Sequence, residues 1–102
     1  MNSKLLSALG LCRKAGKLTA GFDAVADSMK AGTANLVLTS GDLSPKSLKE
    51  IRMIAEKYKV ECMEADITMD EISFRIGRRS GILAVCDPGL ARAVKIAYGH
   101  DN

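Results

Sequence analysis

Apolar residues recur with helical spacing in several segments of the chain. After Gly21, the apolar residues Phe22, Val25, Ala26 and Met29 fall at positions i, i+3, i+4 and i+7, which is the pattern of a helix with one buried face. Similar spacing predicts helices from Ser3 to about Gly16, Gly21 to Ala31, Ser44 to about Tyr58, Thr68 to Gly77, and Asp87 through Tyr98.

Short apolar runs of strand length separate these helices. They span Lys17–Thr19, Asn35–Thr39, Val60–Met63 and Ile82–Cys86. The last run is apolar throughout, so we expect it in the middle of the sheet. Alternating helices and short strands predict one α/β domain over residues 1–102, a three-layer α/β/α sandwich with helices on both faces of a small central mixed sheet.

Three helix starts carry capping residues. Ser44 precedes Pro45, which is tolerated at a first helical position because its missing N–H has no partner to lose. Thr68 and Glu71 have the spacing of a capping box, in which each side chain bonds the backbone of the other residue. Asp87 precedes the last predicted helix in the same way as Ser44. These capping residues predict where three of the helices begin to within about one residue.

The composition is that of a soluble globular protein. Of the 102 residues, 47% are hydrophobic and 26% charged, which is ordinary for such proteins. No apolar run approaches the roughly 20 residues that a membrane helix needs, so no membrane partner is expected. The order of apolar and charged residues at the N-terminus does not fit a signal peptide, and we expect a cytoplasmic protein.

The residues that usually bind metals are few and scattered. Cys12, Cys62 and Cys86 form no C-x-x-C pair, and His100 is the single histidine. We therefore expect neither a disulfide framework nor a metal site. No cofactor is expected either.

Two sequence patterns superficially suggest an enzyme, and neither is favoured. Gly10 to Lys17 superficially resembles a phosphate-binding P-loop, but five residues separate Gly10 from Gly16 where that motif has four, and Leu18 stands in place of the required Ser or Thr. Asp23 and Asp27 lie one helical turn apart, so a pair of catalytic carboxylates is conceivable. Two exposed acids that interact favourably with a helix N-terminus are the simpler explanation, and we expect no catalytic residues.

Charge is unevenly distributed along the chain. Residues 1–19 hold four basic groups and no acidic ones, residues 60–72 hold five acidic groups and no basic ones, and Arg75, Arg78 and Arg79 follow closely. A polarised surface of this kind suits a polyanion on one side. Chance variation among solvated faces is the other explanation, since the net charge is only +3.

The chain resembles the family typified by the archaeal L-seven-Ae ribosomal protein, whose members bind kink-turn RNA, and within it the small bacterial YlxQ-like branch. The resemblance begins with a basic run followed by glycine and a helix, made by Arg13, Lys14, Gly16, Lys17, Gly21 and Gly32. It continues through Ala34–Pro45, Tyr58–Cys62 and Ile76–Val94, and so covers nearly the whole chain.

The resemblance implies a ribosome-associated protein that binds a structured, kink-turn-like RNA. Two segments would grip the RNA side by side: the Lys14–Gly21 turn with the start of the next helix, and the Gly77–Gly81 loop. The RNA-binding residues that it implies are Lys14, Lys17, Gly21, Phe22, Asp23, Ala24, Asp27, Arg78, Arg79 and Ser80. For Phe22, a core position in its helix is favoured over RNA contact.

The chain departs from the family pattern at three of these positions. The family has Asn, Glu and Lys where this chain has Asp23, Ala24 and Asp27. A carboxylate cannot donate the hydrogen bonds of an amide, and alanine can make none. The resemblance therefore implies weakened or altered kink-turn specificity. The alternative is a protein–protein interaction module that kept the fold and lost RNA binding.

Overall fold

The computed structural model describes residues 3–101. Its elements follow one another as α1 (Ser3–Lys14), β1 (Leu18–Ala20), α2 (Phe22–Lys30), β2 (Leu36–Thr39), α3 (Pro45–Lys57), β3 (Cys62–Glu64), α4 (Met69–Ile76), β4 (Ile82–Val85) and α5 (Pro88–Asp101). All five predicted helices and all four predicted strands are present among these residues. None of the described helices has the length and apolar character needed to cross a bilayer.

The strands form one mixed sheet in the order β1-β4-β2-β3. β4 pairs antiparallel with both β1 and β2, whereas β2 and β3 are parallel. β4 is therefore an inner strand, as its uninterrupted apolar sequence predicted. All four of its residues are buried, because helices cover both of its faces.

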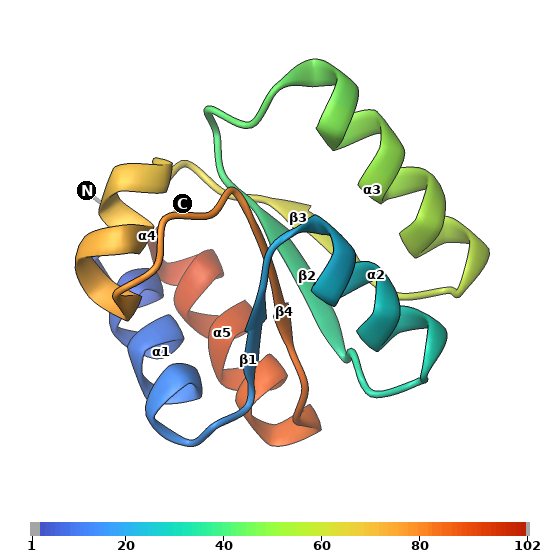
Figure 1. Cartoon of the computed structure of the whole chain (residues 1–102). Coiled ribbons are helices and arrows are strands. Elements are labelled where there is room, and N and C mark those ends of the chain that lie inside the picture. The colour runs from blue at the N-terminus through green and yellow to red at the C-terminus, as the bar shows by residue number, and fades with distance from the viewer. Residues whose placement is uncertain (1–2, 102) are drawn as a thin grey trace.

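The helices divide into two layers, one on each face of the sheet (Figure 1). α1, α4 and α5 pack on the face that carries Leu36, Leu38 and Leu83, and α2 and α3 pack on the face that carries Val37 and Ala84. Alternate residues of a strand point to opposite faces, so each inner strand contributes to both cores. The predicted three-layer sandwich is confirmed.

The predicted helix caps are present. The Ser44 hydroxyl accepts a hydrogen bond from the Ser47 N–H at 3.3 Å, and Pro45 occupies the first turn. Thr68 and Glu71 form the expected capping box, with reciprocal bonds of 3.1 and 2.9 Å. The Asp87 carboxylate accepts from the Leu90 N–H at 2.8 Å.

β1 begins one residue and β3 two residues later than their apolar runs predict, because the backbone in front of each strand completes the C-terminal turn of the preceding helix. The Lys17 N–H bonds to the Cys12 carbonyl at 2.9 Å, and Gly16 takes φ +72°, which together close α1 in a Schellman turn. The Val60 N–H bonds in the same way to the Ala55 carbonyl. Lys17 therefore belongs to the C-terminal turn of α1, and Val60 belongs to that of α3.

Candidate functional site

The N-terminus of α2 is anchored at the start of β4. The Gly21 N–H donates to the Ile82 carbonyl at 3.0 Å, so the first turn of α2 lies beside the loop that leads into β4. Gly21 is the N-cap residue and provides no side-chain cap. The N–H groups of this first turn are thus open to an anionic ligand, which the partial positive charge of a helix N-terminus favours.

Arg78 lies directly against this helix start. A β-carbon at Gly21 would be only 2.8 Å from Nη2 of Arg78. Gly21 also has φ +102°, a conformation that side chains rarely adopt. Glycine is therefore required here for two reasons: it permits the backbone angle, and it lets the guanidinium group reach the helix N-terminus. The Arg78 guanidinium group and the N-terminus of α2 together form a compact cationic surface, which we call the Gly21–Arg78 surface.

A second arginine stands beside Arg78. The Nε atom of Arg13, near the end of α1, donates to the Ile76 carbonyl at the end of α4, at 3.1 Å. Arg13, Ile76 and Arg78 line a hollow of about 70 Å³ whose other walls are Leu18 and Ala20 of β1. The sequence placed Arg13 in the family motif, but only the structure brings it to this surface.

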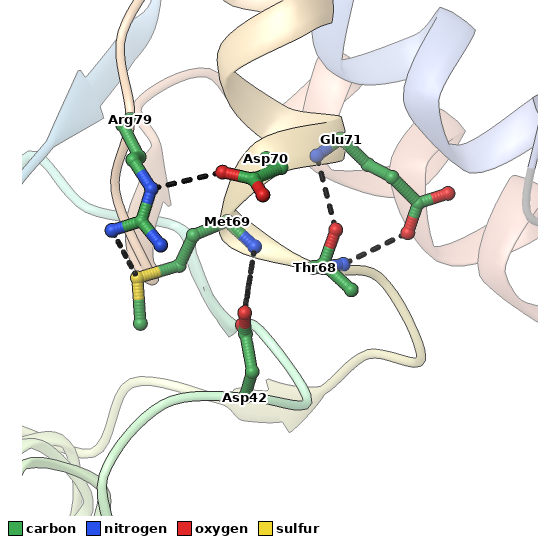
Figure 2. Close-up of polar contacts among 6 residues, drawn as sticks. All are labelled: Asp42, Thr68, Met69, Asp70, Glu71 and Arg79. Carbon is green, nitrogen blue, oxygen red and sulfur yellow. Dashed lines mark hydrogen bonds and ion pairs between the residues drawn. The ribbon is translucent and has the colours of Figure 1, made fainter.

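The Arg79 side chain contacts the first turn of α4 (Figure 2). Its Nε atom forms an ion pair with Oδ1 of Asp70 at 2.9 Å, and Nη1 lies 3.6 Å from the sulfur of Met69. Both partners of the ion pair stay largely exposed, at 61% and 84%, so the pair adds little to stability. It does fix the direction of the Arg79 side chain and partly neutralises its charge.

Ser80 and Gly81 shape the end of the loop from inside the fold. The Ser80 hydroxyl donates to the Ile82 carbonyl at 2.9 Å and accepts from the Ile82 N–H at 3.2 Å, and the residue is buried. A β-carbon at Gly81 would lie 2.8 Å from the Ser40 hydroxyl and 2.9 Å from Leu43. Ser80 and Gly81 therefore fix the backbone path of the loop. Arg78 and Arg79 are exposed to solvent.

Asp42, which the sequence patterns did not single out, ties the loop after β2 to α4 (Figure 2). Its carboxylate oxygens accept from the Met69 N–H at 3.1 and 3.3 Å. The Ser40 hydroxyl, the Met69 N–H and the nearby Arg79 favour the charged carboxylate, so the pKa of Asp42 lies below its ordinary value. Asp42 therefore supports the helix that carries the partner of Arg79.

Replacing Asp42 with asparagine should remove a pH-dependent part of the stability. Because the folded-state pKa is lowered, the carboxylate stabilises the fold above its unfolded pKa of about 3.9 and loses this effect as the pH falls through the folded value. The difference in free energy of unfolding between wild type and Asp42→Asn should shrink from pH 6 to pH 3 in urea titrations. Asp27→Asn, which removes an exposed charge elsewhere, is the control; a difference that stays constant with pH would contradict the prediction.

The three positions that depart from the family lie on the open face of α2. Asp23, Ala24 and Asp27 are exposed, whereas Phe22 is half-buried against the core between α2, α3 and the sheet. The expectation that Phe22 belongs to the core side of its helix is confirmed. The open face of α2 thus presents two carboxylates close to the Gly21–Arg78 surface.

The two predicted binding segments do not lie side by side over their whole length. The Lys17 carbonyl accepts from the Cys86 N–H at 2.8 Å, which places Lys17 at the opposite end of β1 from Gly21. Four residues of extended chain span about 13 Å. Lys14 and Lys17 are exposed, and Lys17 lies at the far end of β1 from the Gly77–Gly81 loop. Leu18 and Ala20 line one hollow with Arg78 of that loop, and Gly21 with the start of α2 adjoins the loop directly.

The cysteines are placed as small core residues. Cys12 is buried and Cys62 half-buried, and burial raises the pKa of both thiols. A raised pKa disfavours the thiolate, the form that acts as a nucleophile or metal ligand. The described side chains include no cluster of three or more metal-ligating residues; the side chain of His100 lies outside the described part.

Comparisons with known proteins agree with the fold and the motif. The profile of the "Ribosomal protein L7Ae/L30e/S12e/Gadd45 family" matches residues 3–94. The RNA-binding protein YlxQ of Enterococcus faecium is 27% identical over 92 residues, which cover 90% of this chain and 88% of that protein.

Two solved structures share the architecture. A protein of unknown function from Bacillus halodurans superposes with a TM-score of 0.86 at 24% identity, over 94% of this chain and 97% of its own. The 15.5 kD RNA-binding protein of Giardia lamblia superposes with a TM-score of 0.78 at 14% identity, over 95% and 83%. The motif, the sandwich fold and the match over most of its length show that this chain belongs to the L7Ae/L30e/S12e/Gadd45 family of ribosomal proteins and resembles its YlxQ-like branch.

Proposed function

We propose that the chain is a single RNA-binding domain that acts on a structured, kink-turn-like RNA in the bacterial cytoplasm, in association with the ribosome. Its family, and a relative that is itself named an RNA-binding protein, support RNA as the partner. They also point to a binding role in place of an enzymatic one. Folded RNA is recognised chiefly by its shape, its phosphates and its exposed base edges.

The observation that carries the proposal is the contact between Arg78 and Gly21. It joins a guanidinium group, which can bind phosphate with two hydrogen bonds, to an uncapped helix N-terminus. Arg13 lies on the same surface. A phosphate placed here would meet both backbone donors and fixed positive charge. The rigid loop around Ser80 and Gly81 keeps this arrangement in place before any RNA arrives.

Specificity is the part of the function that we expect to differ from the family pattern. A bidentate contact to a base contributes about 1–3 kcal/mol in protein–DNA complexes. Asp23 and Asp27 present carboxylates where the family has an amide and an ammonium group, and exposed carboxylates repel phosphates. Backbone and phosphate contacts would therefore carry most of the affinity, and the tandem G·A pairs of a kink-turn would contribute less.

A titration against two RNAs at two salt concentrations tests this proposal. One RNA carries a kink-turn, and the other has its tandem G·A pairs replaced. We expect salt-sensitive binding to both, with a small preference for the first. The triple variant Asp23→Asn, Ala24→Glu, Asp27→Lys should raise that preference about tenfold or more, because it restores base contacts. No binding of the wild-type protein to either RNA would overturn the kink-turn proposal and favour a protein-interaction module.

A further inference from the structure

Phe74 is the most exposed of the large hydrophobic side chains in the described part of the chain. It lies on α4 and is 94% exposed, whereas Ile72 and Ile76 on the other side of the same helix are buried. A fully exposed phenylalanine on a small protein gains nothing from the fold, and aromatic side chains supply much of the energy of protein–protein interfaces.

The ring of Phe74 stands at the rim of a hollow between α1 and α4. This hollow has a volume of about 410 Å³ and is lined by Ser3, Leu6, Asp70, Glu71, Phe74 and Arg75. Leu6 supplies its apolar floor and is itself almost fully buried. One surface thus contains both a projecting aromatic ring and an apolar hollow of a size to receive one. Under a two-fold axis, the ring of each copy could enter the hollow of the other, which would make the contact isologous.

The charged residues around this hollow would also be complementary between two copies related by a two-fold axis. Asp70 and Glu71 lie in the first turn of α4, and Arg75 lies in its last turn. When two copies of α4 are antiparallel, the acidic end of each helix faces the arginine of the other. Parallel copies would instead bring like charges together. Glu71 and Arg75 both line the hollow, so these opposite charges would flank an inserted ring.

We propose that this surface, Leu6 with Phe74 between Glu71 and Arg75, is the docking site for a second copy of the chain. The two α4 helices lie antiparallel, and Phe74 of each copy fills the hollow between α1 and α4 of the other. Each copy contributes only one ring and one hollow to the apolar contact, so the dimer is weak, with a dissociation constant on the order of 100 μM. Self-association of this kind does not depend on RNA binding.

Sedimentation velocity from 10 μM to 1 mM, without RNA, tests the proposal. Wild type should shift from monomer to dimer across this range, and Phe74→Ser should weaken the dimer tenfold to a hundredfold. Met53→Ser is the matched control, because Met53 is an exposed apolar residue on α3 in the opposite layer. It should leave the dimer unchanged. Circular dichroism of each variant confirms that it is folded.

A charge exchange tests the antiparallel arrangement itself. Glu71→Lys alone and Arg75→Glu alone should each impair the dimer. In either variant, residue 71 of one copy and residue 75 of the other carry charges of the same sign. An equimolar mixture of the two variants should restore it, since the mixed pair regains both opposite-charge contacts. A wild-type protein that is monomeric at 1 mM, or a mixture that stays as weak as the single variants, would overturn the proposal.

Discussion

Replacing Arg78 with glutamine should weaken RNA binding about tenfold. The side chain would keep much of its length but lose its charge, and a hydrogen bond to a charged group contributes about 1.5–3 kcal/mol when its partner is desolvated. The slope of the logarithm of the binding constant against the logarithm of the salt concentration should also become shallower, by about the amount expected for one lost phosphate contact. Fluorescence titrations of the wild-type and variant proteins at several salt concentrations would measure both quantities.

The control for this experiment is Arg92→Gln on α5. It removes the same charge from an exposed position on a helix that does not contribute to the Gly21–Arg78 surface, so it should change affinity by much less. Equal losses for the two variants would show that only net charge matters and would remove Arg78 from the proposed site. Thermal melts should be unchanged for both, because neither side chain is buried.

Leu9→Ala should be among the most destabilising single substitutions in the chain. Leu9 is completely buried in the core between α1, α4, α5 and the sheet. Truncating a buried leucine removes its transfer free energy and leaves a cavity, at a cost of about 2.7–5 kcal/mol. This is a large share of the total for a small domain. Urea denaturation followed by circular dichroism would measure the loss.

Leu11→Ala provides a matched control two residues further along α1. Leu11 is 61% exposed, and alanine has a slightly higher helix propensity than leucine. The free energy of unfolding should therefore change by less than about 0.5 kcal/mol. Comparable losses at positions 9 and 11 would mean that α1 buries a different face from the one described here.

Local chemistry explains why so much of the fold was predictable. The capping box of Thr68 and Glu71, the Ser44 cap and the turn at Gly16 each depend on residues within a few positions of one another. Their geometry is decided by short-range hydrogen bonds, so the sequence specifies it directly. The buried helix faces follow from apolar spacing in the same way.

The site required long-range contacts that no local pattern contains. The placement of Lys17 beside Cys86, at the far end of β1 from Gly21, depends on the register between β1 and β4. The ion pair between Arg79 and Asp70 depends on the path of the loop after α4. The sequence grouped Arg78 and Arg79 as equivalent basic residues, but only Arg78 reaches the helix start. The exposure of Phe74 could have been noticed, since it falls off the Met69, Ile72 and Ile76 face.

The sequence by itself determined the helices, the strands, the sandwich architecture and the family, because these follow from periodicity, caps and a motif read in order. The tertiary structure alone decided which basic groups share a surface. Side chains distant in the chain meet only after the strands have paired and the helices have packed, and a change of one residue in register would move them to the other face. The Gly21–Arg78 surface and the Phe74 hollow are both products of that packing.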